Sequence, residues 1–476
     1  MPDPRPSGGS GPGAPGPLPA PLRLVSAGLL AGGVLAGFAA AVVAGRRLLP
    51  AVALGVMGGI VLIGRASRRP AGRGGPVSAP APVPTGRPGE PAGDLLTFSI
   101  LVPARDEAVV LPALVADIAR QDHRGADGTV GWELIVIDDR SIDGTAGAAL
   151  AAAAAHGIAD RIRVVRRDGP DLPDGKGAAL TAAPPAACGG DFIVVLDADA
   201  RIGPAFLSRL AAHAAAGHDA LTARRRILDP DSSLLARCQA DEQTLDGAIQ
   251  LARWNLGGCS EFRGDGIVIR RELLAAVDGW RAGALTEDLD LSSRIAIARG
   301  TRVLWAGDAE AWEEPVRTWS ALWLQRLRWA EGALRRSIEH GPAQLRSPAL
   351  APAARLDFAL YAGQLAVPPI ALGALGGALI LRRPWASVSF IGGYLAFGTG
   401  LAWGALRLEP DGPGTVLDPA QRLRRALAVG LFNAIWLAAV PGALLRLATR
   451  RGPIEYAKMA HVGGGDRGGD RGGVRG

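Results

Sequence analysis

The sequence contains only three cysteines, Cys188, Cys238 and Cys259, among its 476 residues. They show neither the even count of a disulfide framework nor the paired spacing of a zinc site. We therefore expect three packing residues in a protein of a reducing compartment.

A second missing feature is the G-x-G-x-x-G turn that follows the first strand of dinucleotide-binding folds. Here the first predicted strand, residues 97–103, continues into ARDEAVV. The sequence thus argues against a dinucleotide-dependent dehydrogenase.

Charged residues are absent from five apolar runs, which cover residues 24–45, 48–64, 358–381, 386–406 and 426–444. The first run is long enough to cross the roughly 30 Å hydrocarbon core of a bilayer, and the second is at the lower limit. Because intramembrane charges mark ion and proton pathways, their absence argues against an ion-coupled transporter. A pore that passes an uncharged polymer chain is still compatible with these runs.

Arginine dominates the net charge of +7, and the isoelectric point is near 10.1. Beside apolar runs, such a charge favours anionic lipid over nucleic acid as a partner. RASRRPAGRGG follows the second run and marks a cytoplasmic end by the positive-inside rule. Two spans before the central region and three after it would place the C-terminus outside, yet arginines also follow the last run. We therefore expect one C-terminal run to be re-entrant or interfacial.

Composition and hydropathy divide the chain into seven segments: a disordered start (1–21), two membrane helices (22–64), a Pro/Gly-rich linker (65–94), an α/β domain (95–314), an amphipathic helix (315–345), about three membrane or re-entrant helices (355–447) and a mostly disordered tail (448–476).

The α/β domain is predicted from apolar strands that alternate with helices. The expected strands are 97–103, 133–137, 161–165, 192–196, 266–270 and 301–307, and two longer helices are 232–255 and 287–299. Such alternation predicts a parallel sheet with helices on both faces. Ligands of these sheets bind beyond the carboxyl ends of the strands.

Two carboxylates follow the fourth strand in the stretch FIVVLDADA, residues 192–200. Asp197 and Asp199 point to the same side if the two-residue period of the strand continues. Mg²⁺ or Mn²⁺ joins such carboxylates to substrate phosphates. The alternative is an Asp pair that caps the next helix.

The second strand ends in IVIDDRSIDGT. A carboxylate at this strand end can accept the imide N–H of a uracil ring, a group that adenine lacks. We expect Asp143, in the same stretch, to be the N-cap of the following alanine-rich helix.

Residues 316–340 form an apolar stripe with spacings of three and four, which is typical of an amphipathic helix. The stripe comprises Val316, Trp319, Trp323, Leu327, Ala330, Leu334 and Ile338. Arginines on the other side favour a helix at a membrane interface. A tryptophan-rich helix packed in the protein core fits the pattern equally well.

Five motifs, PARDE, DDRSIDGT, LDADA, LTEDLDL and QRLRW, occur in this order between residues 97 and 340. Their order between membrane spans resembles the inverting family 2 glycosyltransferases of the GT-A fold, specifically the membrane-embedded branch. The resemblance implies an α/β, Rossmann-like and mostly parallel sheet flanked by transmembrane helices. It also implies a divalent cofactor, Mg²⁺ or Mn²⁺.

The resemblance implies roles for the matched residues. Glu107 and Asp139 would hold the ribose and uracil of a UDP-sugar, Asp197 would contact the donor, and Asp199 would bind the metal. Lys176 lies where the family carries a basic residue near the donor, although a solvated loop lysine fits equally well.

Asp288 in LTEDLDL matches the catalytic base of the family. A carboxylate in hydrogen-bond reach takes the proton of the acceptor hydroxyl as it attacks the anomeric carbon. The metal and nearby cations stabilise the charge on the leaving UDP, and a one-step displacement inverts the sugar. Glu287 and Asp290 fit as helix-start acids, and only the family pattern selects Asp288 over them.

Gln325, Arg328 and Trp329 of QRLRW share one helix face, and we expect all three at the donor. Trp329 offers an apolar platform for a sugar, and Arg328 offers a charge-assisted contact to the diphosphate. The alternative is a buried Trp329 and an Arg328 that snorkels at the interface.

The chain departs from the family at two places. Asp106 stands in PARDE where the family usually has Asn. EFRGDGIVIRR, residues 261–271, lacks the Cys or Ser/Thr of cellulose- and hyaluronan-type synthases. This segment, LTEDLDLSSRI and EYAKMAH resemble the bacterial and cyanobacterial glucosyldiacylglycerol synthases more closely.

The resemblance implies a multi-pass protein of the inner cell membrane with a cytoplasmic catalytic domain. It would transfer a hexose, with glucose expected, from a UDP-sugar to a lipid acceptor, with diacylglycerol expected because the interfacial helix holds the base beside the bilayer. The alternative within the family is a processive polysaccharide synthase. A non-catalytic nucleotide-sugar-binding membrane protein is the alternative of another class, and the intact Asp199 and Asp288 disfavour it. No nucleic-acid partner is expected.

Overall fold

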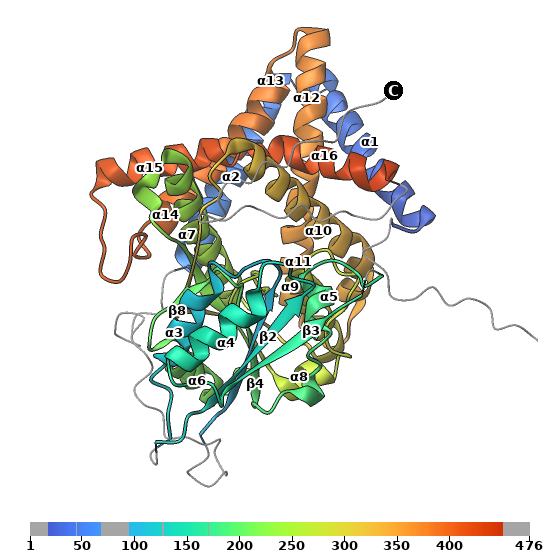
Figure 1. Cartoon of the computed structure of the whole chain (residues 1–476). Coiled ribbons are helices and arrows are strands. Elements are labelled where there is room, and N and C mark those ends of the chain that lie inside the picture. Colours follow the sequence, from blue (N-terminus) through green and yellow to red (C-terminus); the bar gives the residue numbers. More distant parts are fainter. Residues whose placement is uncertain (1–17, 44, 68–94, 126–127, 170, 451–476) are drawn as a thin grey trace, which may run out of the picture.

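The computed structural model describes residues 18–43, 45–67, 95–125, 128–169 and 171–450. It has a sheet domain below and a group of apolar helices above it (Figure 1). Most of the expected linker and of the two expected disordered ends, including EYAKMAH, lies outside the described residues.

One eight-stranded sheet forms the centre of the lower domain, with the order β3-β2-β1-β4-β7-β6-β8-β5. The strands are β1 (Phe98–Ala104), β2 (Trp132–Asp139), β3 (Ile162–Arg167), β4 (Phe192–Val195), β5 (Arg201–Ile202), β6 (Ala220–Ile227), β7 (Ile267–Arg270) and β8 (Leu304–Glu313). The expected α/β class is confirmed, but the sheet is mixed, since β7 runs antiparallel to both β4 and β6. The chain enters β7 at the carboxyl end of β4, where Val195 pairs with Ile267. This entry places Asp265 beside the end of β4.

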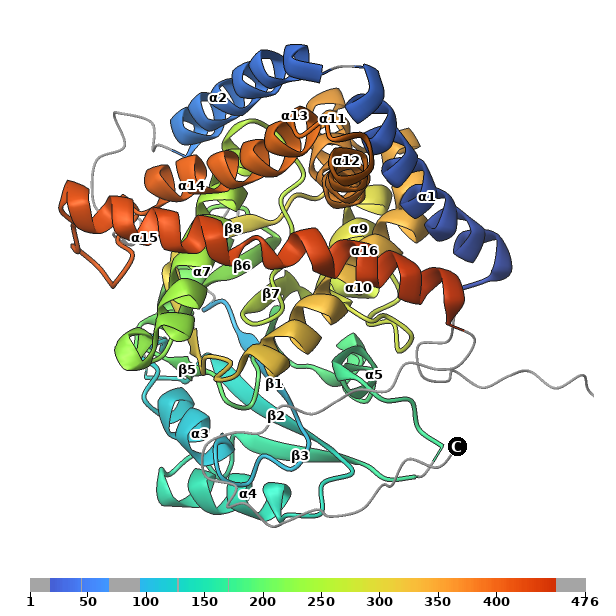
Figure 2. The ribbon, with the colours of Figure 1, turned by 90° about the horizontal axis from the view of Figure 1, so that it is seen from above.

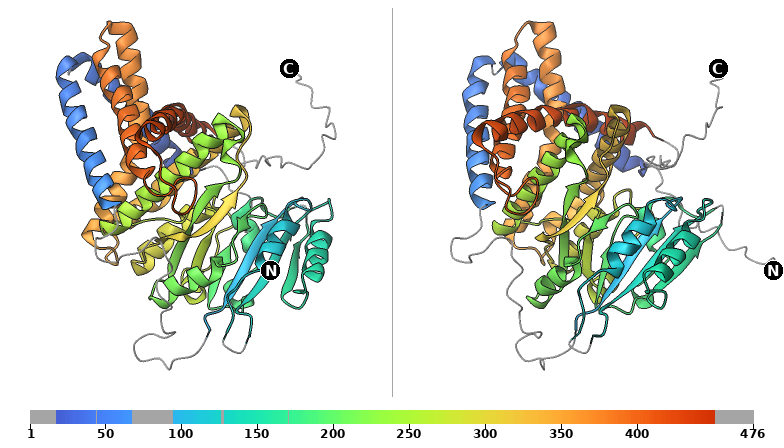
Figure 3. Two further views of the ribbon diagram at one scale, coloured as in Figure 1. Left: turned by 90° about the vertical axis from the view of Figure 1, so that its left-hand side faces the viewer. Right: turned by 60° about the vertical axis from the view of Figure 1, so that its left-hand side comes forward.

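Helices cover both faces of the sheet, because the strands are apolar on both sides. Along β1, Ile100 and Val102 pack on one face and Leu101 packs on the other. The first face is covered by α3 (Leu111–Ala119), α4 (Thr145–Ala155) and α6 (Phe206–Ala215), and the second by α5 (Lys176–Leu180), α8 (Arg271–Ala275) and α9 (Glu287–Arg299). Two longer helices, α7 (Leu234–Asn255) and α10 (Trp319–Arg346), lie between the sheet and the apolar helices (Figure 3).

Five stretches of the described residues are long and apolar enough to cross a membrane. They contain α1 (Ala20–Val43), α2 (Leu48–Ala66), α11 (Pro352–Gly363) with α12 (Val367–Leu381), α13 (Trp385–Ser387) with α14 (Gly393–Ala405), and α15 (Pro419–Phe432) with α16 (Ile435–Thr449). Glycines bring α1 and α12 into backbone contact. A Cβ atom on Gly37 would lie 1.9 Å from the carbonyl oxygen of Ile370, and one on Gly373 would lie 1.9 Å from that of Val34. Small residues allow this close approach of apolar helices.

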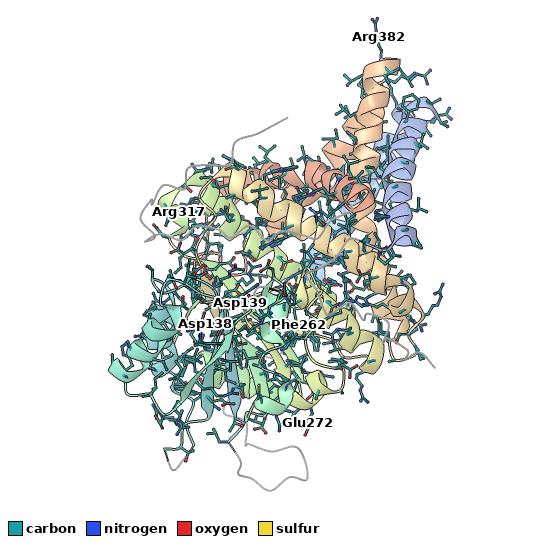
Figure 4. All side chains as sticks on the ribbon, turned by 45° about the vertical axis from the view of Figure 1, so that its right-hand side comes forward. Asp138, Asp139, Phe262, Glu272, Arg317 and Arg382 are labelled. Carbon is teal, nitrogen blue, oxygen red and sulfur yellow. The ribbon has the colours of Figure 1, made fainter. Side chains whose placement is uncertain are left out.

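The last apolar stretch runs crosswise to α12. Figure 2 shows α12 end on and α16 lengthwise. Arg425, near the start of the stretch, pairs with Asp241 of α7, and Arg450, just past its end, lies 2.6 Å from Glu331 of α10. Both ends are therefore held by helices that border the sheet domain. In contrast, α12 carries Arg382 to the end remote from the sheet (Figure 4).

The apolar stripe of α10 packs against α16. Leu327, Ala330 and Leu334 form one buried cluster with residues of α16 that include Val440 and Leu444. The helix begins at Trp319 and continues past His340 to Arg346, with Pro342 inside it. Protein therefore covers most of this stripe, and the site end of α10 is held rigidly under α16.

Candidate functional site

A cavity of about 880 Å³ opens at the carboxyl ends of β1, β2 and β4 and continues to α10, α11, α12 and α16. Its walls bring together every residue that the sequence predicts for the site: Glu107, Asp139, Lys176, Asp197, Asp199, Asp288, Gln325, Arg328 and Trp329. Residues more than 200 positions apart in the chain thus meet around one space.

The loop after β1 is locked to the loop after β2. Asp106 has a φ of 54°, a left-handed conformation that Asp and Asn adopt more readily than other side chains. Its carboxylate accepts a hydrogen bond from the backbone N–H of Ile142 at 2.8 Å, and the N–H of Glu107 donates to the Thr145 hydroxyl at 2.8 Å. Asp in place of the family's Asn therefore satisfies the same local geometry.

Asp139 ends β2 and faces the cavity with its carboxylate fixed by two arginines. Arg140 lies 3.0 Å and Arg167 lies 2.7 Å from it. A carboxylate held in one orientation is a suitable acceptor for an imide N–H. Asp143 is not the N-cap of α4, because Gly144 takes that position with a φ of 88°. Asp143 instead bridges the two loops through backbone N–H groups on either side.

Lys176 begins α5 and is not a solvated loop lysine. Its Nζ lies 2.5 Å from Asp197 Oδ1, 3.0 Å from the carbonyl oxygen of Gly264 and 3.6 Å from Glu287 Oε1. Burial lowers the pKa of this lysine, but the charges of Asp197, Glu287 and Asp265 outweigh burial and raise it. Lys176 is therefore a fixed cation between the acids of β4 and those of α9.

Asp197 and Asp199 line the cavity from the turn after β4, so the two-residue period of the strand does not set their directions. Asp265 lies behind them, and its Oδ1 accepts the backbone N–H of Asp197 at 3.0 Å. Its other oxygen, Oδ2, is buried without a hydrogen-bond partner in the described part of the chain. Burial and the charge of Asp197 raise the pKa of Asp265 well above its ordinary value.

The carboxylates at this end fit a hard divalent cation. Within the described ranges, no cluster of three His, Cys, Asp or Glu side chains is arranged to hold a metal by itself. Mg²⁺ commonly binds through one or two carboxylates together with substrate phosphates. Asp199 and Asp197 supply such oxygens, and a bound diphosphate would complete the coordination.

The structure separates the three acids of LTEDLDL. Asp288 and Glu287 line the cavity from the first turn of α9, whereas Asp290 faces away and is held at 2.8 Å by both His340 and Arg294. Burial raises the pKa of Asp288. Burial also raises the pKa of Glu287 to about 7, and the adjacent Asp288 charge adds to this rise against the effect of Lys176. Glu287 lies 3.6 Å from Lys176, whereas the structure gives Asp288 no ion pair among the described residues.

Residues that sequence reasoning missed surround QRLRW. Arg326, between the motif residues, is almost fully buried, pairs with Glu242 of α7 and lies 4.3 Å from the ring centre of Trp329. Arg225 of β6 is 5.5 Å from the same ring and pairs with Glu313 at 2.6 Å. Trp329 is therefore packed among guanidinium groups. The run ARRR, three arginines in one strand, was the available signal for Arg225.

The inner wall of the cavity comes from helices that the site motifs do not include. It comprises Glu242 and Asp246 of α7, Tyr361 of α11, Leu365, Pro368, and Trp436 and Val440 of α16. Arg263 joins this wall to the loop before β7, since it lies 2.8 Å from Asp246 and donates to the Tyr361 hydroxyl at 2.5 Å. No local motif marks these residues, because they meet only when α7, α11 and α16 pack together.

Comparison with known proteins adds independent information. The family described as "Glycosyltransferase like family 2" matches residues 96–332. A β-monoglucosyldiacylglycerol synthase of Synechocystis sp. is 30% identical over 76% of this chain and 74% of its own length. The protein of the same description from Trichormus variabilis is 27% identical over 79% of each.

Among solved structures, the mannosyltransferase PcManGT from Pyrobaculum calidifontis, determined in complex with GDP-Man and Mn²⁺, is 18% identical. It aligns with 85% of this chain and 99% of its own, with a TM-score of 0.53. At this identity the likeness shows a shared fold.

Proposed function

Because the chain belongs to glycosyltransferase family 2, we propose that it is a membrane-bound inverting enzyme that transfers glucose from UDP-glucose to diacylglycerol. The observation that carries this proposal is the single cavity, in which Asp288 stands between an acidic strand edge and a wall of apolar helices. The similarity to β-monoglucosyldiacylglycerol synthases over three quarters of the chain supports the acceptor and the sugar.

The nucleotide lies at Asp139 and Glu107, and the diphosphate lies toward Asp197, Asp199 and Arg328. Asp199, with Asp197, would hold Mg²⁺ or Mn²⁺, which neutralises charge on the leaving diphosphate when bound. Lys176 is too fully engaged by acids to act as a proton donor, and it keeps Asp197 in place.

Asp288 accepts the proton of the acceptor hydroxyl. Its raised pKa brings its basicity closer to that required of a general base at neutral pH. Attack by the hydroxyl from the face opposite the diphosphate forms the new glycosidic bond as the old bond breaks. The product sugar therefore has inverted anomeric configuration.

We further propose that four stretches cross the membrane and that the fifth, α15–α16, lies along its surface. A straight helix of the 31 residues from Pro419 to Thr449 would extend about 45 Å, but both ends are bound on the side of the sheet domain. Arginines at the remote end, Arg382 among them, mean that the positive-inside rule alone does not orient these helices. We place the sheet domain on the cytoplasmic side because the nucleotide-sugar donor is made in the cytoplasm.

The topology is tested with a reporter fused after the last residue that is active only in the cytoplasm. Four crossings place the C-terminus on the cytoplasmic side, so we expect the reporter to be active. A control fusion in the segment between α2 and β1 should also be active. An inactive C-terminal fusion beside an active control would contradict the surface position of α15–α16.

The reaction is tested by incubating membranes that contain the protein with labelled UDP-glucose, Mg²⁺ and diacylglycerol. We expect label in the organic-solvent extract as a β-linked glucosyl lipid, and none when Asp288→Asn replaces the wild type. Label in an ethanol-insoluble polymer would instead support a processive synthase.

A further inference from the structure

The part of the cavity beyond Asp288 has a wall of its own, which we call the acceptor arm. It is bordered by Glu242, Asp246, Tyr361, Leu365, Pro368, Trp436 and Val440. Four of these side chains are carbon-rich and come from the apolar helices, so the arm has room and surface for acyl chains. The remaining residues, Glu242, Asp246 and Tyr361, are polar.

Each of the four arginines at this arm already has a carboxylate partner. Arg253, whose guanidinium lies 3.8 Å from the ring centre of Tyr361, is 3.0 Å from Asp357. Arg263 lies 2.8 Å from Asp246, and Arg336, over the ring of Phe358 in α11, lies 2.8 Å from Glu261.

Arg326 pairs with Glu242, and its guanidinium lies 5.8 Å from the ring centre of Trp436. These arginines face four carboxylates, Asp246, Glu242, Asp357 and Glu261, and Glu261 lies within 3.7 Å of Arg253, Arg263 and Arg336. A phosphorylated lipid would bring a further negative charge into a partly buried space in which these four arginines are already paired, which is costly.

From this charge balance we propose that Asp246 and Glu242 are specificity-determining residues that restrict the acceptor arm to uncharged lipids. The inference rests on the proposed function and adds to it the rule by which the acceptor is chosen. An uncharged glycerolipid keeps the balance: its hydroxyl faces Asp288, its ester carbonyls can accept from Arg263, and its chains follow Leu365 and Val440. Removing either acid would leave the arm with one arginine more than its carboxylates, which favours binding of an anionic headgroup.

The wild-type protein gives the first test. In nonionic detergent micelles with diacylglycerol as acceptor, two dead-end competitors are compared at equal surface fraction: dioleoyl phosphatidic acid and the uncharged 3-O-methyl ether of dioleoylglycerol. We expect the ether to compete with diacylglycerol, and phosphatidic acid to be at least about tenfold weaker, as an unmatched charge implies. Equal or stronger competition by phosphatidic acid would overturn the proposal.

The second test uses Asp246→Asn, which removes the carboxylate that lies 2.8 Å from Arg263. We expect phosphatidic acid to inhibit this variant about tenfold more strongly than the wild type, competitively with diacylglycerol and without a change in the KM for UDP-glucose. Glu242→Gln should act in the same direction through Arg326. Unchanged inhibition in an active variant of either kind would contradict the assignment, and if neither variant is active the wild-type comparison decides.

Asp219→Asn is the matched control. Asp219 pairs with Arg270 at 2.6 Å, and the side chains are 36% and 24% exposed, close to the 30% and 16% of Asp246 and Arg263. This pair lies outside the cavity, so the control should keep wild-type resistance to phosphatidic acid. If diacylglycerol is not glucosylated at all, the proposed function fails. If it is glucosylated but phosphatidic acid competes equally, only the present inference fails.

Discussion

The donor side of the cavity and the acceptor arm are both rich in charge, but the charges are arranged in opposite ways. On the donor side, one cation, Lys176, lies between Asp197 and Glu287 and is also influenced by the charge of Asp265. Along the acceptor arm, four arginines meet four carboxylates. The first arrangement awaits a metal and a diphosphate, whereas the second is complete before any ligand binds. One cavity can therefore receive a highly charged donor at one end and an uncharged lipid at the other.

Asp288 lies where the two sides meet, so its replacement should have the largest effect. Asp288→Asn keeps the shape of the side chain but removes its ability to take a proton. We expect kcat to fall about 10²- to 10⁴-fold, with little change in either KM, measured with labelled UDP-glucose. Near-normal turnover would remove Asp288 from the mechanism and shift attention to Glu287.

Lys176→Met should break the donor side alone. Without this cation, Asp197 and Glu287 repel each other and the incoming diphosphate. We expect the KM for UDP-glucose to rise about tenfold or more, because a buried ion pair loses one partner, while the KM for diacylglycerol changes little. An equal rise in both constants would show that the two sides are not separable.

The pH dependence should sharpen the assignment of the base. A protonated Asp288 cannot accept a proton, and burial raises its pKa, so kcat/KM should rise with pH along a limb that lies above the ordinary range near 4. The neighbouring Glu287 has a pKa raised to about 7. Glu287→Gln removes a like charge and should move the limb to lower pH. A limb that stays in place would mean that the two acids do not interact.

Tyr361→Phe should give the smallest effect. In contrast to Lys176→Met, it should change the KM for diacylglycerol and not the KM for UDP-glucose. It removes the hydroxyl that accepts from Arg263 but leaves the ring and the Arg263–Asp246 pair. Since one hydrogen bond contributes about 1 kcal/mol, the KM for diacylglycerol should rise about fivefold or less. The KM for UDP-glucose is the internal control, and a larger change there would place Tyr361 on the donor side.

Local patterns in the sequence were sufficient for much of this protein. Continuous apolar strands flanked by helices predicted the α/β domain, and the helix from Glu287 to Arg299 was predicted with its observed bounds. Charge-free runs predicted the apolar helices. The five motifs named eight site residues and the family resemblance added Lys176, and all nine line one cavity. These features depend on residues close in sequence, where strand and helix periods and family motifs are directly visible.

Only the tertiary structure decided how distant segments meet. It made β7 antiparallel, turned Asp290 away from Asp288, and gave Lys176 its acidic partners. It also laid α15–α16 crosswise, with ends bound to Asp241 and Glu331. The acceptor arm belongs wholly to this second group, because its arginines and acids lie on helices far apart in the chain. The partner of a charged side chain cannot be predicted from that residue alone, because the pairing forms only when the helices pack.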